Sequence, residues 1–203
     1  MFTGIVQAVG RLVARTPQGN GARLEIDAGG LDLGDVREGD SIAVAGVCLT
    51  ALAPGGQRFG ADASAETLAR TTLGTLPVGA ALNLEKSLRL ADRLGGHLVS
   101  GHVDGTGRVR AIVDEGAAQR WTFAAPAALM RYIAAKGSIC IDGTSLTVNT
   151  VGDDAFGITL IPHTLAATTF GERRAGDPVN LEVDLVARYV ERLASAATLP
   201  PLP

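Results

Sequence analysis

The sequence predicts a mainly-β protein built from two similar small barrels and a final helix. Three features predict this fold: an internal repeat, many short apolar segments between turn residues, and one amphipathic segment near the end. The chain has 203 residues, of which 46% are hydrophobic and 19% charged, as is typical of a globular protein.

The repeat has a constant offset of 97 residues. Gly4 matches Gly101 and Gly46 matches Gly143. Longer identical runs pair 41–42 with 138–139, 49–50 with 146–147, 67–69 with 164–166, and 83–85 with 180–182. We therefore predict a first repeat over 1–97, a second over 98–184, and a helix and tail over 185–203. Two copies of one fold suggest two similar binding sites for similar ligands.

Short strands are predicted by apolar segments bounded by glycine and proline. They cover residues 4–9, 23–26, 41–44 and 82–85, with turns at 17–21, 29–30 and 54–56. Many short strands with glycine corners favour a small closed barrel, because closure leaves no sheet edge exposed.

Short helices are predicted at equivalent places in each repeat. Ser64 can cap a helix over 65–68, and its counterpart follows Pro162. A third helix is predicted over 126–136, because proline at its first turn and Gly137 after its end are good helix boundaries.

The segment 185–193 has no counterpart in the repeat. It places Val186, Tyr189, Val190 and Leu193 on one stripe of a helix. That stripe packs either against the chain's own barrels or against the same helix of other subunits. The proline-rich residues 200–203 are not expected to be helical.

Charge and cysteine content exclude several classes of function. The net charge is −3 with no basic cluster, which argues against a nucleic-acid surface. No segment has the pattern of a signal peptide or a membrane-spanning helix. Cys48 and Cys140 lie at non-equivalent repeat positions, so we expect no disulfide and a cytoplasmic protein.

Differences between the copies point to the chemistry. If both repeats bind similar ligands, polar residues present in only one repeat are candidates for catalysis. The first-repeat and second-repeat residues at such positions are Ile5 and His102, Cys48 and Ser145, Ala45 and Asp142, Glu66 and His163, and Ser87 and Asp184. One site is therefore predicted to be polar and reactive where the other mainly binds.

His102 is the strongest single candidate, because histidine is the usual general base near neutral pH and here lies between glycines. His97, His102 and His163 lack the spacing of a zinc site. The glycine-rich loops match no phosphate-binding motif. We expect no metal site.

Four segments together resemble the riboflavin synthase alpha-chain family, and the resemblance covers residues 1 to about 195. The segments are MFTGIV at 1–6, GVCLT at 46–50, GGHLVSGHVDG at 95–105 and DGTSLTV at 142–148. The family implies two tandem six-stranded Greek-key barrels and a C-terminal helix that gathers three subunits into a homotrimer. It also implies a cofactor-free reaction in which two molecules of 6,7-dimethyl-8-ribityllumazine exchange a four-carbon unit, giving riboflavin and 5-amino-6-(ribitylamino)uracil. The site would lie between the first barrel of one subunit and the second barrel of a neighbour.

The resemblance implies which residues bind the two lumazines. One pocket would use Gly4, Ile5, Val6, Cys48, Leu49, Thr50, Asp62, Ala63, Ser64, Ala65, Glu66 and Thr67. The other would use Gly101, His102, Val103, Lys136, Ser145, Leu146, Thr147, Thr159, Leu160, Ile161, Pro162, His163 and Thr164. Phe2 would pack over the site.

Catalytic roles follow from the same resemblance. His102 would move a proton of the acidic C7 methyl group or activate water. Cys48 and Ser41 would add to the acceptor ring or hydrogen-bond to it, and Thr147 and Asp184 would orient the ring and the ribityl hydroxyls. One departure is Ala45, which stands where the family often has asparagine, so one hydrogen bond of the first pocket is not supplied.

Two other functions fit a lumazine-binding barrel. A lumazine protein would hold a lumazine or flavin without turnover, and a flavin reductase would consume NAD(P)H. The presence of His102, Cys48, Ser145 and Thr147 favours the synthase over the binding protein.

Overall fold

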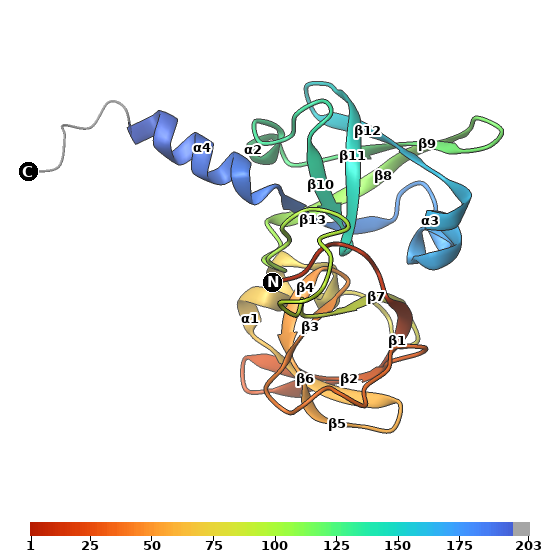
Figure 1. Cartoon of the computed structure of the whole chain (residues 1–203), viewed down its shortest axis with the longest axis vertical. Helices are drawn as coiled ribbons and strands as arrows, with labels where there is room; N and C mark the ends of the chain where they lie inside the picture. The colour runs from red at the N-terminus through yellow and green to blue at the C-terminus, as the bar shows by residue number, and fades with distance from the viewer. Residues whose placement is uncertain (197–203) are drawn as a thin grey trace, which may run out of the picture.

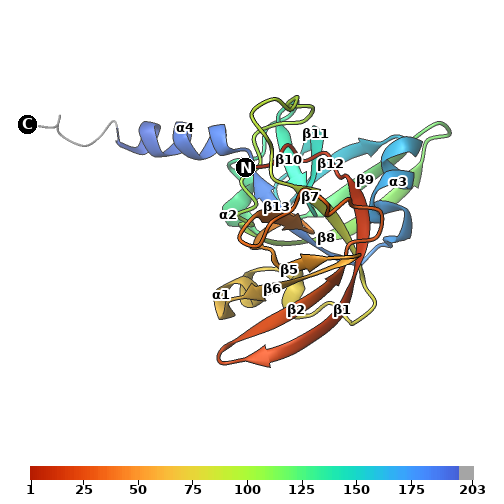
Figure 2. The same cartoon turned by 60° about the horizontal axis from the view of Figure 1, so that its bottom comes forward.

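The structure, a computed structural model, describes residues 1–196, with side chains through residue 195. The two repeats form two β units that lie against each other, and one helix projects away from both (Figures 1 and 2). The predicted tail at 200–203 lies outside the described residues.

The first repeat is a curled seven-stranded sheet. Its elements are β1 (Ala8–Gln18), β2 (Gly21–Asp27), β3 (Ser41–Val44), β4 (Val47–Thr50), β5 (Leu52–Gly55), β6 (Arg58–Ala63), the helix α1 (Ala65–Arg70), the 3-10 turn η1 (Thr72–Gly74) and β7 (Ala81–Lys86). The strand order is β4-β3-β7-β1-β2-β6-β5.

The second repeat is a closed six-stranded barrel. Its elements are β8 (Gly105–Asp114), β9 (Gln119–Ala124), α2 (Ala127–Met130), β10 (Ser138–Ile141), β11 (Thr144–Val151), β12 (Ala155–Leu160), α3 (Pro162–Ala167), η2 (Thr169–Glu172) and β13 (Pro178–Val183). The strand order is β10-β11-β12-β9-β8-β13, and its non-sequential pairing is that of a Greek key.

The predicted fold class is confirmed, with one difference between the repeats. β11 is continuous, whereas its equivalent is divided into β4 and β5 at Ala51, and the following Ala53 has a positive φ of 44°. The first repeat therefore has seven strands in place of the six expected, and it follows the same order around a sheet whose two end strands are joined through Ala51.

Each repeat has its own hydrophobic core. The first core is mainly aliphatic and includes one aromatic residue, Phe59. The second core is aromatic: Trp121 packs edge-on against Phe170 at a centroid distance of 5.4 Å, and Phe123 stacks on Phe156 at 5.6 Å. Such pairs add to the free energy of burial, so each repeat has its own source of stability.

The predicted helix starts are confirmed, and one helix is shorter than predicted. The hydroxyl of Ser64 accepts a hydrogen bond from the Thr67 amide at 3.1 Å, and α3 begins at Pro162. The helix predicted over 126–136 ends after Met130. The chain turns there, and Lys136 has a positive φ of 65°, which is incompatible with a continuing helix.

The C-terminal helix α4 (Leu185–Ala196) is where the sequence placed it. It projects from the second repeat (Figures 1 and 2), and its four stripe residues are each at least 60% exposed: Val186, Tyr189, Val190 and Leu193. Packing of this stripe against the chain's own barrels was therefore the wrong alternative. No helix among the described residues has the length and apolarity to cross a membrane.

A strand predicted over 4–9 begins instead at Ala8, because the residues before it form a leader segment. We call residues 2–6 the first leader and residues 97–103 the second leader. The two leaders contact each other through a pair of hydrogen bonds between Phe2 and Val99. Thr3 and Gly4 donate their amides to the carboxylate of Glu85, which excludes them from a sheet ladder.

The second leader is held in the same way. The amides of Ser100 and Gly101 donate to the carboxylate of Glu182 at 2.7 and 3.0 Å. Each leader is thus tied to the last strand of its own repeat, and what it contacts next decides where the site residues gather.

Candidate active sites

A cavity with a volume of about 390 Å³ lies between the first repeat and residues 101–104. Cys48 comes from β4, Glu66 and Thr67 come from α1, and His102 comes from the second leader. The cavity is lined further by Val47, Arg70, Thr71, Gly101, Val103, Asp104 and Arg188. Its wall therefore combines a thiol, an imidazole and several charged groups.

A glycine allows the second leader to approach Cys48. The amide of Cys48 donates to the carbonyl oxygen of Gly101 at 2.8 Å. Gly101 has a φ of 78°, and a Cβ at this position would lie 2.6 Å from the Cβ of Cys48. Only glycine fits both the backbone conformation and the space, so this residue places the following His102 in the cavity.

The equivalent contact in the second repeat is made by the first leader. The amide of Ser145 on β11 donates to the carbonyl oxygen of Gly4 at 2.7 Å. Here a histidine approaches from the other leader: Nδ1 of His97 lies 2.6 Å from Oγ of Ser145. The hydroxyl that corresponds to the Cys48 thiol is therefore paired with an imidazole.

The environment of His97 favours the neutral ring. Burial lowers the pKa of His97, and the negative charges of Asp184 and Glu182 oppose this shift. Nε2 of His97 is buried and has no hydrogen-bond partner among the described residues. Asp184 also accepts the amide of Val186 at 2.9 Å and so caps the start of α4.

The predicted grouping of residues into pockets was wrong in one respect. Gly4, Ile5 and Val6 were assigned to the pocket of Cys48, and Gly101, His102 and Val103 to the pocket of Ser145. The structure places Gly4 on Ser145 and Gly101 on Cys48. Each leader passes to the opposite repeat, and each candidate site is therefore built from both halves of the chain.

Other predicted binding residues have structural contacts. Asp62 is paired with Arg23 at 2.5 Å, and Thr159 accepts a hydrogen bond from Asn149 at 2.8 Å. Four further residues are buried in the cores: Leu49, Ala63, Leu160 and Phe2. Phe2, expected to pack over the site, lies beneath it in a small cluster with Ala43, Val99 and Cys140, against which Cys48 packs.

The remaining predicted residues lie on the surface or are half-buried. Thr50 and Ala65 are exposed on the first repeat, and Leu146 and Thr164 are half-buried on the second. Val6 is also half-buried, and the other exposed ones are Ile5, Ser64, Lys136, Thr147, Ile161, Pro162 and His163.

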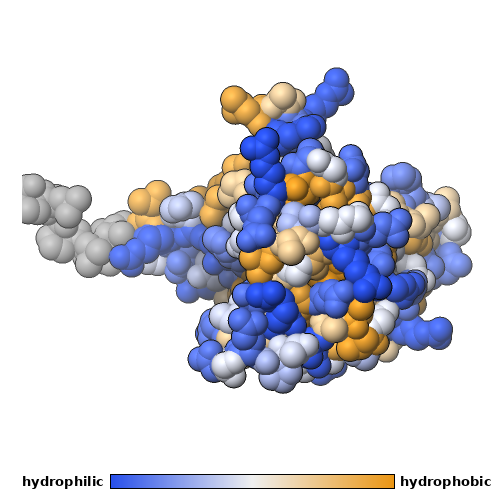
Figure 3. Space-filling model, turned by 90° about the horizontal axis from the view of Figure 1, so that it is seen from below, coloured by the Kyte–Doolittle hydropathy of each residue, from blue (hydrophilic) through white to orange (hydrophobic). Residues whose placement is uncertain are grey.

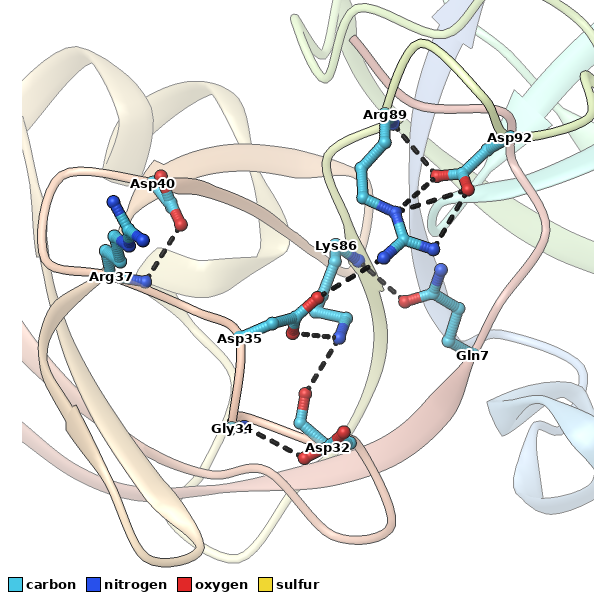
Figure 4. Close-up of polar contacts among 9 residues, drawn as sticks. All are labelled: Gln7, Asp32, Gly34, Asp35, Arg37, Asp40, Lys86, Arg89 and Asp92. Carbon is cyan, nitrogen blue, oxygen red and sulfur yellow. Dashed lines mark hydrogen bonds and ion pairs between the residues drawn. The ribbon is translucent and has the colours of Figure 1, made fainter.

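Ser41 does not line the cavity of Cys48 and His102. It borders a separate cavity of about 240 Å³ with Gln7 and Lys86. Figure 4 shows the ion pairs beside that cavity: Lys86 lies 2.5 Å from Asp35, and the guanidinium of Arg89 contacts Asp92 at 3.1 Å.

These ion pairs hold three segments of the first repeat together. Lys86 also donates to the carbonyl oxygen of Asp32 at 3.0 Å, and its amide donates to Gln7 at 2.9 Å (Figure 4). The loop before β3 is thereby fastened to the end of β7. Lys86 and Arg89 are thereby paired with Asp35 and Asp92, whereas the Asp40 carboxylate at the same cavity accepts the backbone amide of Arg37 (Figure 4).

The pair Ala45 and Asp142 belongs to the junction between the repeats and lines neither candidate site. Asp142 is buried, contacts Arg173 at 2.7 Å and accepts the Asn180 amide at 2.8 Å. Burial raises the pKa of Asp142, and Arg173 opposes the shift. The carbonyl oxygen of Ala45 accepts a hydrogen bond from Asn180. The substitution to alanine thus changes the junction, and the first pocket loses no hydrogen bond through it.

Through residue 196, no group of three or more His, Cys, Asp or Glu side chains could hold a metal ion. Cys48 and Cys140 are both free. Burial raises the pKa of Cys140 well above its usual value, which suits an inert thiol.

Sequence reasoning missed three residues near the candidate sites: His97, Asp104 and Arg188. The sequence pointed to His97 only as a possible zinc ligand, and at the offset of 97 residues it has no counterpart in the first repeat. Asp104 and Arg188 form an ion pair of 2.6 Å at the wall of the Cys48 cavity. Arg188 comes from the helix outside the repeat, so no comparison of the two copies could reveal it.

The fold and these two equivalent, differently equipped sites define a duplicated ligand-binding protein with one site on each repeat. The sequence profile of the family described as "Lumazine binding domain" matches residues 3–87 and 100–184, once in each repeat.

Relatives narrow the family further. The riboflavin synthase of Mycobacterium tuberculosis (strain H37Rv) is 48% identical, and 97% of this chain and 100% of that protein are covered. The riboflavin synthase of Brucella abortus is 46% identical, with 96% and 98% covered. That of Photobacterium phosphoreum is 44% identical, with 95% and 88% covered. The chain belongs to the riboflavin synthase family, and its activity is that of this enzyme.

Solved structures agree on the fold. LumP complexed with riboflavin has a TM-score of 0.82 and 26% sequence identity, covering 90% of this chain and 99% of LumP. LumP complexed with 6,7-dimethyl-8-(1'-D-ribityl) lumazine has a TM-score of 0.79 and 25% identity. The identity to the synthases is much higher than that to LumP, which favours the enzyme over the binding protein.

Proposed function

We propose that the chain catalyses the dismutation of two 6,7-dimethyl-8-ribityllumazine molecules, one bound by each kind of repeat. One molecule gives up its four-carbon unit and becomes 5-amino-6-(ribitylamino)uracil, and the other takes up that unit and becomes riboflavin. The two products together contain all atoms of two substrate molecules, so the exchange needs no external oxidant or reductant.

The crossing of the leaders is the observation that carries the proposal. It gives the two repeats the same backbone frame, with Gly101 against Cys48 and Gly4 against Ser145. The two sites also carry different side chains, since His102 lies at the first site and His97, from the start of the second leader, lies at the second. Two molecules of one substrate need binding sites of similar shape. The donor and the acceptor molecule nevertheless need different catalytic side chains around them.

The proton transfers are assigned to His102. The C7 methyl group of the lumazine is acidic because its anion delocalises into the ring, and His102 is exposed in the cavity where a ring would lie. Its imidazole can take a methyl proton or activate the water that adds to the donor ring. Cys48 lies in the same cavity and is the candidate to add to the acceptor ring or to hydrogen-bond to it.

The second site is assigned to binding and orientation. Ser145 and Asp184 lie near His97, and Thr147 and Lys136 lie on the exposed side of β11 and of the turn before β10. These groups can hydrogen-bond to the ring carbonyls and to the ribityl hydroxyls. Ser41 stays a candidate for the acceptor ring, although it faces a neighbouring cavity in a single chain.

The complete active centre is proposed to lie between subunits of a homotrimer. Bringing two rings face to face replaces a bimolecular encounter and can contribute roughly 7–11 kcal/mol to the barrier reduction. The exposed stripe of α4 supports such an assembly, because an isolated helix does not leave four large apolar residues in water without a partner. We also propose that the first lumazine-binding domain covers residues 1–97, the second covers residues 98–184, and the trimerisation helix and tail follow from residue 185.

The free cysteines Cys48 and Cys140 favour a reducing compartment, and we assign the enzyme to the cytoplasm.

The experiment is to incubate the purified protein with 6,7-dimethyl-8-ribityllumazine alone and to follow riboflavin by its absorbance and fluorescence. Formation of riboflavin without any added cofactor supports the proposal. Tight binding without turnover, or turnover only with NAD(P)H, would contradict it. Truncation after Asp184 tests the shared site: monomers with little activity are expected, and a fully active monomer would place the centre within one chain.

A further inference from the structure

The helix α4 contributes one side chain to the cavity of Cys48 and His102. Nη2 of Arg188 lies 2.6 Å from Oδ1 of Asp104 and donates to the carbonyl oxygen of His102 at 3.4 Å. Arg188 and Asp104 both line this cavity. An element outside the repeat therefore reaches the backbone of the residue assigned to proton transfer.

The first repeat is an internal control for the role of Asp104. Gln7 occupies the equivalent position, and its side chain accepts the Lys86 amide at 2.9 Å. Asp104 accepts the Val183 amide in the same way, also at 2.9 Å. A neutral side-chain amide is therefore sufficient to accept the backbone N–H of the last strand at this position. The charge of Asp104 is needed only for Arg188, which comes from the helix outside the repeat and has no counterpart in the first repeat.

The ion pair contributes little to stability by itself. The side chain of Arg188 is 37% exposed although that of Asp104 is only 11% exposed, so water screens the pair from the arginine side. The effect of the ion pair is on the geometry of the chain. The guanidinium of Arg188 contacts both the carboxylate of Asp104 and the carbonyl oxygen of His102, two residues earlier. The segment 102–104 is thereby fixed against α4.

We propose that Arg188 is a positioning residue for the synthase reaction. It holds His102 in the cavity through its ion pair with Asp104 and its hydrogen bond to the carbonyl oxygen of His102. The inference rests on the proposed role of His102. At 100° per residue, Arg188 projects from the side of α4 opposite the exposed stripe. The helix proposed to gather subunits with one face thus shapes the active site with the other.

A second ion pair of α4 supplies a matched control. Glu191, close to Arg188 on the helix surface, contacts Arg131 at 3.0 Å and so also ties α4 to the second repeat. Neither Glu191 nor Arg131 lines the cavity. If Arg188 merely anchors the helix, loss of the Glu191 pair should have a similar effect on catalysis.

The test compares the full-length variants Arg188→Gln, Asp104→Asn, their double variant and Glu191→Gln. We expect each of the first two to lower kcat/KM by about fivefold to twentyfold. The double variant should be no worse than the poorer single variant, because the two residues act as a unit. Glu191→Gln should stay within twofold of the parent protein, and sedimentation should give one oligomeric state for all four.

The pH profile of kcat/KM separates positioning from plain anchoring. The charged groups that share the cavity with His102 are Asp104 and Arg188, and Glu66 and Arg70, which pair with each other at 2.8 Å. Without Arg188 the negative charge of Asp104 is uncompensated, so the acid limb should move to higher pH. In Asp104→Asn the remaining positive charge should move it to lower pH.

Rescue completes the design. Arg188→Lys keeps the charge and should recover part of the loss, and circular dichroism identifies any variant that fails to fold. Near-normal kinetics of Arg188→Gln, an equal loss in Glu191→Gln, or additive losses in the double variant would each overturn the inference. If the parent protein makes no riboflavin, the proposed function fails before this inference is reached.

Discussion

Asn83 and Asn180 make the same pair of hydrogen bonds in opposite directions across the junction of the two repeats. Asn83 donates to the carbonyl oxygen of Asp142 at 2.9 Å and accepts the Thr169 amide at 2.8 Å. Asn180 donates to the carbonyl oxygen of Ala45 at 2.8 Å and accepts the Thr72 amide at 2.7 Å. The last strand of each repeat therefore holds a turn of the other, and the two repeats pack as one unit.

The first prediction concerns this junction. Asn83→Ala leaves the buried Asp142 carbonyl and Thr169 amide without partners, which should lower the free energy of unfolding by about 2–3 kcal/mol. Denaturant unfolding followed by Trp121 fluorescence measures the loss. The control is Asn149→Ala, an exposed asparagine with one side-chain hydrogen bond, which should change stability by less than about 1 kcal/mol. Equal losses of unfolding free energy in the two variants would show that the hydrogen bonds of the junction stabilise the protein no more than an exposed one.

The second prediction concerns the close approach of Gly46 and Gly143. Gly46 has a φ of 80°, and a Cβ there would lie 2.6 Å from the Gly143 amide nitrogen. Gly46→Ala must therefore push the repeats apart as well as strain the backbone, and should destabilise the protein by several kcal/mol, about 3 or more.

Gly56→Ala isolates the backbone part of that effect. Gly56 also has a positive φ, of 59°, but a Cβ there would meet nothing within 4 Å. This variant should lose about 1 kcal/mol. Thermal melting compares the two variants. Similar melting temperatures would contradict the prediction that the contact with Gly143 makes Gly46→Ala the more destabilising change.

Much of the fold could be predicted from the sequence because the information is local or repeated. The alternation and turn residues located β3 and β7, the Ser64 hydroxyl marked the start of α1, and the constant offset predicted equal repeats. The length of α2 was missed, since a helix-forming composition does not show that the chain must turn before Lys136.

The crossing of the leaders could not be predicted from the repeat. Gly4 and Gly101 occupy equivalent positions whether each leader packs on its own repeat or on the other one. Only the three-dimensional contacts, Gly101 with Cys48 and Gly4 with Ser145, distinguish the two arrangements. The pairing of His97 with Ser145 was hidden for the same reason, because it depends on where the second leader starts.

The third prediction concerns a buried ion pair that one repeat has and the other lacks. Asp142 and Arg173 pair at 2.7 Å, whereas the equivalent positions hold the buried apolar residues Ala45 and Leu76. Arg173→Leu alone leaves a buried carboxylate without a partner charge and should cost about 3–5 kcal/mol. The double variant Asp142→Ala, Arg173→Leu copies the first repeat and should recover most of that loss.

Denaturant unfolding of the single and double variants gives the coupling energy of this pair. A double variant as unstable as Arg173→Leu would show that the second repeat cannot accommodate the apolar pair that the first repeat has at these positions. It would also assign the main role to the hydrogen bond between Asp142 and the Asn180 amide.

The fourth prediction concerns the residue assigned to proton transfer. His102→Ala should lower kcat by more than tenfold, because general acid–base catalysis by a positioned group typically contributes a factor of about 100 or more. The side chain is exposed, so the melting temperature should not change. Stopped-flow measurement of riboflavin formation gives the rate, and a rate close to that of the parent protein would remove His102 from the mechanism.

The fifth prediction is a pH dependence of stability that originates at His97. Burial lowers the pKa of this imidazole in the folded protein, while in the unfolded chain it titrates near pH 6.5. Between these two values the unfolded chain binds more protons, so stability must fall as the pH drops below about 6.5. The exposed carboxylates whose pKa is lowered by ion pairs, such as Asp35 and Asp62, act below their ordinary values near 3.8 and so outside this window.

The variant His97→Asn removes the titrating ring and keeps a polar group that can face Ser145. The difference in melting temperature between pH 7.5 and pH 5.5 should be smaller in this variant than in the parent protein. His163→Asn is the matched control, because His163 is exposed on α3 and should leave the pH dependence unchanged. If His97→Asn keeps the full difference, another group titrates in this range, and the buried imidazole is not the source of the acid sensitivity.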